Sequence, residues 1–186
     1  MERPKEELLA NDETEGLGTL FRLRLPWLVI GLIGGALIAY FISRYESLLA
    51  ERVSLAYFIP VIVYLSDAVG TQTEAIMIRN LARGRVKLAT YLSKEIALGL
   101  IFGGLFGSAT GIIALVMFNQ ADTAWTVATA TLATIASATV VATISTFLIY
   151  QEHQDPAVGA GPLTTIIQDA IAILIYFGIA SWTIFS

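Results

Sequence analysis

The sequence has 186 residues, of which 56% are hydrophobic and only 14% are charged, whereas a typical soluble domain has about 25% charged residues. This composition excludes an ordinary soluble domain and predicts a chain whose main solvent is lipid, with room for one domain. The lack of cysteine excludes disulfides and thiolate metal sites, and the formal charge of -4, without a basic stripe among aromatic residues, gives no support for nucleic-acid binding.

Residues 1–24 form a short polar tail, which we expect to be cytosolic and to remain attached, because no signal-peptide cleavage pattern follows the first apolar stretch. Residues 25–186 are predicted to form one all-α domain of five membrane-spanning helices, since each apolar run has about the length that crosses a bilayer, ~20 residues. The fourth run is rich in Thr, Ser and Ala, which let membrane helices pack closely, so we expect it inside the bundle. The predicted spans are residues 26–43, 55–78, 96–118, 125–150 and 163–185.

The basic residues indicate how the chain is oriented in the cell membrane, which it crosses several times. All 11 Lys and Arg residues lie at or before Lys94, and only Arg44 and Arg52 fall on the side opposite to the N-terminus. Because basic residues collect on the inner side, we expect the N-terminus inside and the C-terminus outside. Many transporters are built from two repeats around a midplane site, and no internal repeat is visible here. A second copy of the chain is therefore expected to supply the other half, as a homodimer.

Three carboxylates fall inside the apolar spans, namely Asp67 and Glu74 on the second and Asp169 on the fifth. A charge at the centre of a bilayer costs at least ~2.5 kcal/mol, so each needs a partner or a wet cavity. Asp169 has no basic residue on its own span or on the fourth. It must be protonated, hydrogen-bonded, paired with an early Arg, or facing a cation. Thr165 and neighbouring polar residues would supply oxygen ligands for a hard cation.

Asp67 precedes Gly70 and Gln72 on the second span. We expect Gly70, together with Pro60, to interrupt this helix so that backbone and side-chain oxygens turn inward, as in broken transporter helices. Glu74 lies seven residues after Asp67 and therefore on the same face, two turns away. The alternative for Glu74 is an ion pair with Arg79 or with a neighbouring helix.

Other polar residues have weaker claims to a functional role. Glu46 and Glu51 lie near the predicted outer mouth, where they either gather cations or only solvate a helix end. His153 is interpreted as a loop residue, and Glu95 as the local partner of Lys94 at the head of the third span.

The apolar spans and the polar residues within them resemble the membrane domain of the MgtE family of magnesium transporters. This family is related to the eukaryotic solute-carrier magnesium transporters. The most specific match is the last one, where Asp-Pro-Ala, Gly-Pro and Thr-Thr precede an aspartate fourteen residues after the first. The resemblance covers the chain from Arg24 onward. The matching segments are RLPWL, LAYFIPVIV, VGTQTEAIMIRNLARG, KEIALGLIFG and DPAVGAGPLTTIIQDAIAILIYF.

The resemblance implies a homodimer with the ion pathway along its interface, where Asp169 holds Mg²⁺ through its water molecules. It also implies that Asp155 is an acidic residue at the inner mouth of the ion pathway and that Glu46 is an acidic residue at its outer mouth. Two departures stand out. The family's Gly-Gly-Asn run is replaced by Ser66-Asp67-Ala68, which adds a carboxylate that could shift ion selectivity or couple protons. The family's cytosolic sensor has no counterpart in this sequence, so we expect regulation by the membrane domain, the acidic tail or another protein.

We therefore predict a divalent-cation channel or transporter, not an enzyme, with Mg²⁺ as the transported ion and Asp169 as principal ligand. Asp67, Thr165 and Gln72 are expected to support it. An intramembrane aspartyl protease would also need two membrane aspartates as an acid and a base, but the Gly-x-Gly-Asp motif is missing before Asp169. A non-transporting membrane assembly partner is the other alternative.

Overall fold

A computed structural model describes residues 16–84, 86–151 and 156–185, with side chains from residue 163 onward in the last range. The described residues form helices and no strands. The helices are α1 (Leu17–Ser43), α2 (Glu46–Glu51), α3 (Val53–Ala56), α4 (Ile59–Ala82), α5 (Leu88–Phe118), α6 (Ala121–Gln151) and α7 (Pro156–Phe185).

Five segments of the described chain are long and apolar enough to cross a membrane, which confirms the five predicted spans. Their ends differ from the prediction. Helix α1 begins at Leu17, so part of the expected polar tail is helical, and α5 begins at Leu88, eight residues before the predicted start. The backbone of α7 is already helical from Pro156, a residue whose fixed φ suits the first turn of a helix. The five segments are Leu17–Ser43, Val53–Ala82, Leu88–Phe118, Ala121–Gln151 and Leu163–Phe185.

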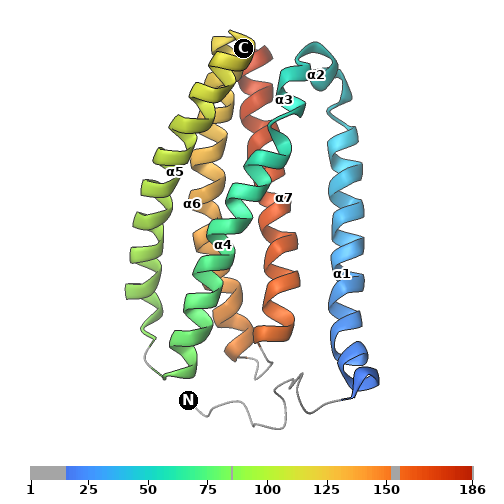
Figure 1. Ribbon diagram of the computed structural model, residues 1–186, viewed down its shortest axis with the longest axis vertical. Coiled ribbons are helices and arrows are strands. Elements are labelled where there is room, and N and C mark those ends of the chain that lie inside the picture. Colours follow the sequence, from blue (N-terminus) through green and yellow to red (C-terminus); the bar gives the residue numbers. More distant parts are fainter. Residues whose placement is uncertain (1–15, 85, 152–155, 186) are drawn as a thin grey trace.

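Helices α4, α5, α6 and α7 form a bundle, and α1 stands beside α7 (Figure 1). Helix α6 contacts α4, α5 and α7 and has the largest buried share of the five spans, which confirms its predicted interior position. No residue of α1 is buried. Helix α1 starts at the same end of the bundle as the α4–α5 connection, whereas α7 ends at the opposite end (Figure 1).

A stripe of glycines brings α5 against the backbone of α6. A Cβ added to Gly107 would lie 2.6 Å from the carbonyl oxygen of Ala128, and one added to Gly103 would lie 2.7 Å from that of Leu132. Such four-residue spacing of small residues allows close approach of membrane helices, where dispersion contacts replace the hydrophobic effect. The stripe consists of Gly99, Gly103, Gly107 and Gly111.

The short helices α2 and α3 close the end of the bundle opposite to the α4–α5 connection (Figure 1). Tyr45, next to α2, stacks on Phe177 of α7 with ring centroids 4.4 Å apart. The Tyr176 hydroxyl donates a hydrogen bond of 2.7 Å to the carbonyl oxygen of Leu55 in α3. Because both aromatic residues of α7 are buried, these contacts hold the α2–α3 segment on the bundle.

Candidate functional site

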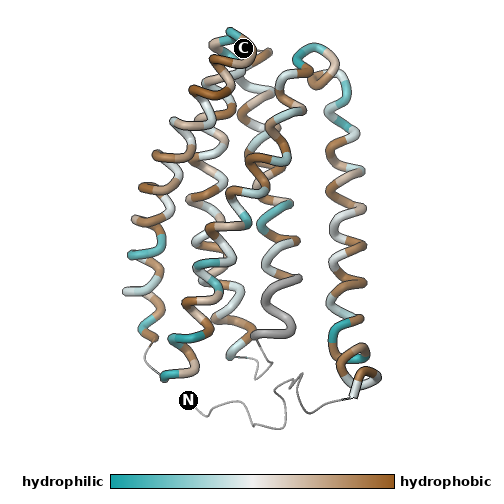
Figure 2. Tube along the Cα trace, in the orientation of Figure 1, coloured by the Kyte–Doolittle hydropathy of each residue, from teal (hydrophilic) through white to brown (hydrophobic). Residues whose placement is uncertain are grey.

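The fold brings Asp67 of α4 and Asp169 of α7 onto one face of the bundle. Thr165, one turn before Asp169, donates a hydrogen bond of 3.3 Å from its Oγ1 to Asp67 Oδ1. The Asp67 carboxylate interacts electrostatically with the carboxylates of both Asp169 and Glu74. All three acidic side chains are half-buried. Figure 2 shows the corresponding hydrophilic stretches interrupting the apolar colour of α4 and α7.

Arg79, the basic residue near the end of α4, forms no salt bridge with these carboxylates. The ion pair within the described part of the chain joins Arg52 to Asp122 at 3.7 Å, at the α2–α3 end of the bundle. The alternative pairing of Glu74 with Arg79 is therefore not formed, and Asp169 forms no pair with Arg22, Arg44 or Arg52. An uncompensated charge inside a bilayer costs about 2.5–3.5 kcal/mol on insertion scales. Protons, water or cations beside the carboxylates are therefore needed to neutralise or solvate their charge.

Buried polar contacts hold the helices behind the acidic face. Gln168 is 2% exposed and donates a hydrogen bond of 3.2 Å from Nε2 to the carbonyl oxygen of Ala138 in α6. A Cβ added to Gly70 would lie only 2.6 Å from Gln168 Cδ. Helix α4 is continuous from Ile59 to Ala82, so the prediction that Gly70 interrupts it is wrong. Gly70 instead provides space for the Gln168 amide.

Further hydroxyl contacts fix the same three helices. Ser66 donates a hydrogen bond of 3.2 Å to the carbonyl oxygen of Thr134. Ser145 and Thr164 share a hydrogen bond of 2.7 Å between their hydroxyl oxygens. Because these groups are buried and paired, they set the spacing of α4, α6 and α7 at the height of the acidic residues.

The other predicted site residues lie apart from the Asp67–Asp169 face or outside the described residues. Gln72 is exposed on α4, and no hydrogen bond between it and either aspartate occurs in the described ranges. Glu46 is exposed at the start of α2, at the end of the molecule opposite to the α4–α5 connection (Figure 1). Asp155 lies outside the described residues.

Glu95 is a buried residue between α4 and α5. Glu95 is only 7% exposed and accepts a hydrogen bond of 2.8 Å from Thr73 Oγ1 of α4, so the interpretation of Glu95 as the local partner of Lys94 is wrong. The Tyr91 hydroxyl donates to the carbonyl oxygen of Thr73 at 3.4 Å. The available signal was spacing, because Glu95 lies four residues before Gly99 and shares the buried face of the glycine stripe.

The site offers the oxygen ligands that hard cations prefer, since carboxylates and hydroxyls meet on one half-buried face. No group of three or more acidic or histidine side chains in the described ranges is close enough to hold a metal ion by itself. A cation on this face would therefore need water molecules, hydroxyl or carbonyl oxygens, or ligands from another chain.

Comparison with known proteins gives one consistent result. The family model MgtE, described as a divalent cation transporter, matches residues 59–179, a range that includes Asp67, Glu74 and Asp169. The chain is 32% identical over 165 residues to the magnesium transporter MgtE of Bacillus subtilis and 34% identical over 161 residues to that of Enterococcus faecalis. Each alignment covers 85% of this chain and 36% of the relative.

The magnesium transporter MgtE of Thermus thermophilus is 27% identical over 165 residues, again over 36% of its length. The chain thus spans about a third of the length of these relatives.

Proposed function

Because this chain belongs to the MgtE family of divalent cation transporters, we propose that it carries Mg²⁺ across the cell membrane along a pathway between two copies of itself. The family consists of membrane transporters and not enzymes, so the protease alternative has no support. The observation that carries the proposal is that Asp67 and Asp169 interact on one half-buried face, where Thr165, one turn before Asp169, donates a hydrogen bond to Asp67.

The chemistry of Mg²⁺ suits a site of this kind. Mg²⁺ dehydrates reluctantly and is usually held through one or two carboxylates while it keeps several waters. Asp169 acts as the principal ligand in the proposal, through these waters, and Thr165 orients Asp67 beside it. Gln72, Glu74, Asp155 and Glu46 remain proposed contributors along the pathway.

A homodimer would complete the site. The described side chains of one chain offer no group of three acidic or histidine ligands that could enclose an ion. A symmetric pair would bring a second Asp67 and Asp169 toward the same axis, because the same patch of both subunits meets in a twofold interface. The hydrated cation between the four carboxylates would then offset their mutual repulsion.

The distribution of basic residues supports an orientation of the chain in the membrane. Arg22 of α1, Arg79 of α4 and Lys87 before α5 lie toward the end of the bundle where α1 starts, whereas Arg44 and Arg52 lie at the other. Placing the more basic end inside puts the N-terminus in the cytosol and Glu46 at the outer face.

Reconstitution tests the ion site. Purified protein in liposomes that contain a magnesium-sensitive dye should admit Mg²⁺, and Asp169→Asn should reduce influx to the leak of empty liposomes because it removes the charge while keeping the shape. Asp122→Asn is the matched control, since Asp122 is an exposed carboxylate on α6 far from Asp169 in the bundle. If Asp169→Asn admitted Mg²⁺ at the unmodified rate, the assignment would be wrong.

Two further measurements test the role of Asp67 in ion selectivity and the pairing of two chains. Asp67→Asn should change the relative influx of Mg²⁺, Mn²⁺, Co²⁺ and Ca²⁺, because it removes the additional carboxylate beside Asp169. Mass measurement in detergent should give twice the chain mass of 20.1 kDa. A monomer that transports Mg²⁺ at full rate would contradict the interface pathway.

A further inference from the structure

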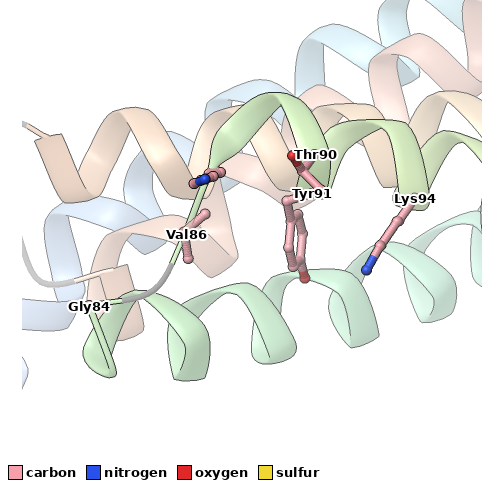
Figure 3. Close-up of a pocket in the computed structure, with 6 residues that line it drawn as sticks. Gly84, Val86, Thr90, Tyr91 and Lys94 are labelled. Atoms are coloured by element: carbon pink, nitrogen blue, oxygen red, sulfur yellow. The ribbon is translucent and has the colours of Figure 1, made fainter.

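A cavity of about 470 Å³ lies between the end of α4 and the start of α5, a volume within the usual range of small-molecule sites. It is lined by Gly84, Val86, Lys87, Thr90, Tyr91 and Lys94 (Figure 3). None of these residues belongs to the carboxylate face described above. The cavity therefore requires a separate explanation.

The charge of the cavity is positive. Tyr91 and Lys94 are three residues apart and share one face of α5, and Lys87 is the residue that caps the start of the same helix. In Figure 3, Tyr91 and Lys94 point from α5 toward α4. Neither lysine forms an ion pair with a described residue. Glu95 pairs with neither lysine within the described ranges, and its buried carboxylate accepts a hydrogen bond from Thr73 instead.

The cavity lies where two membrane spans end, at Ala82 and Leu88. Lys94 is six residues inside its span, about 9 Å along the helix at 1.5 Å per residue. A lysine at this depth places its ammonium at headgroup level by extending its stem toward the interface. The Tyr91 ring, with an apolar body and a polar hydroxyl, is typical of the same layer.

The basic face of α5 continues toward the membrane centre as an apolar stripe. Leu98, Ile101 and Leu105 follow Lys94 at spacings of four, three and four residues, and they are 41%, 64% and 62% exposed. A molecule with a phosphate at the lysines and a hydrocarbon chain along this stripe would satisfy both surfaces. Because the cavity opens at the end of a membrane span beside this lipid-facing stripe, a lipid can contact the lysines and the stripe at once, whereas a free phosphate can contact the lysines alone.

From this geometry we propose that the cavity binds the phosphate headgroup of an anionic membrane lipid, with one acyl chain lying along the apolar stripe of α5. Lys87 and Lys94 contact the phosphate, and the Thr90 hydroxyl is available as a hydrogen-bond donor. Basic pockets between membrane helices commonly hold anionic headgroups. The site goes beyond the proposed ion pathway and does not depend on it.

Native mass spectrometry of the purified protein in detergent tests the site with phosphatidylglycerol as the probe and phosphatidylcholine as the zwitterionic comparison. Phosphatidylglycerol should bind more tightly. Lys87→Gln and Lys94→Gln should each weaken its binding about fivefold, and the double variant about 25-fold, as expected for one headgroup contact per lysine. Lys94→Arg should retain binding, because it keeps the charge.

Arg22→Gln is the matched control, since it removes one charge from the same end of the bundle on α1, away from the cavity. It should leave phosphatidylglycerol binding unchanged. The proposal is overturned if the double variant binds phosphatidylglycerol as the unmodified protein does. It is also overturned if Arg22→Gln weakens binding equally, which would indicate general surface attraction, or if millimolar inorganic phosphate displaces the lipid, which would indicate a free-anion site.

Discussion

Replacing Gly70 by alanine tests how the carboxylate face is held in place. The added Cβ would lie 2.6 Å from Cδ of Gln168, whereas carbon atoms in good contact lie about 3.5–4.0 Å apart. The amide must therefore move by about 1 Å, and the hydrogen bond of 3.2 Å from Gln168 to the Ala138 carbonyl oxygen is stretched or lost. Since Asp169 follows Gln168 directly, the same movement displaces the proposed ion ligand.

The expected cost follows from three terms. Overpacking of a buried site costs about 1–3 kcal/mol, and loss of one hydrogen bond costs about 1 kcal/mol. Alanine inside a helix is more favourable than glycine by about 1 kcal/mol, which offsets part of this cost. The net loss in the free energy of unfolding is about 1–3 kcal/mol, which corresponds to a melting temperature lower by roughly 4–8 °C for the middle of that range in a chain of this size.

Thermal unfolding in detergent measures the effect, and Gly104→Ala in α5 is the matched control because a Cβ there meets nothing within 4 Å. The Gln168→Ala background provides the decisive comparison, since shortening Gln168 removes the clash. In that background Gly70→Ala should stabilise the protein by about 1 kcal/mol, the gain of alanine over glycine inside a helix, giving a coupling of about 3 kcal/mol between the two positions. Equal costs in both backgrounds, or a melting temperature no lower than that of Gly104→Ala, would refute the reasoning.

Three further substitutions have expected outcomes in the same unfolding assay. Gly107→Val should cost more than about 3 kcal/mol, because the new side chain meets the backbone of α6, which cannot move aside as a side chain can; full stability would show that the two helices separate easily. Tyr176→Phe should cost about 1 kcal/mol, because the Leu55 carbonyl oxygen loses its 2.7 Å side-chain donor but still accepts a hydrogen bond of 3.1 Å from the Phe58 N–H; an unchanged melting temperature would mean that the hydroxyl contributes nothing to holding α3 on α7. Arg52→Ala should change stability by less than about 1 kcal/mol, because its 3.7 Å ion pair with Asp122 is exposed; a larger loss would reveal a contact beyond this pair.

The five spans could be predicted from the sequence because lipid burial imposes a local requirement, a continuous apolar run of sufficient length. The limits of the helices could not. Helix α5 extends back to Leu88, past Lys94 and Glu95, because a long basic side chain reaches the interface and a buried carboxylate finds a partner on another helix. Neither condition is visible in a hydropathy pattern.

The candidate acidic residues could also be recognised from the sequence, since Asp67 and Asp169 stand out as charges inside apolar runs. Their meeting could not be derived from spacing. The Thr165 hydroxyl reaches Asp67 across 98 residues of chain, a contact that depends on how α4 and α7 pack.

Gly70 and Glu95 show the same division between local and tertiary information. The sequence identified Gly70 as unusual, but its role is spatial, because only the neighbouring α7 places the Gln168 amide against it. Proximity in the sequence predicts Lys94 as the partner of Glu95, whereas the fold turns the Glu95 carboxylate toward Thr73 on α4. Composition and hydropathy thus determined the solvent of this protein, the number of its spans and the residues that are costly to bury. Only helix packing decided which of those residues face one another, because that depends on side chains from segments far apart in the chain.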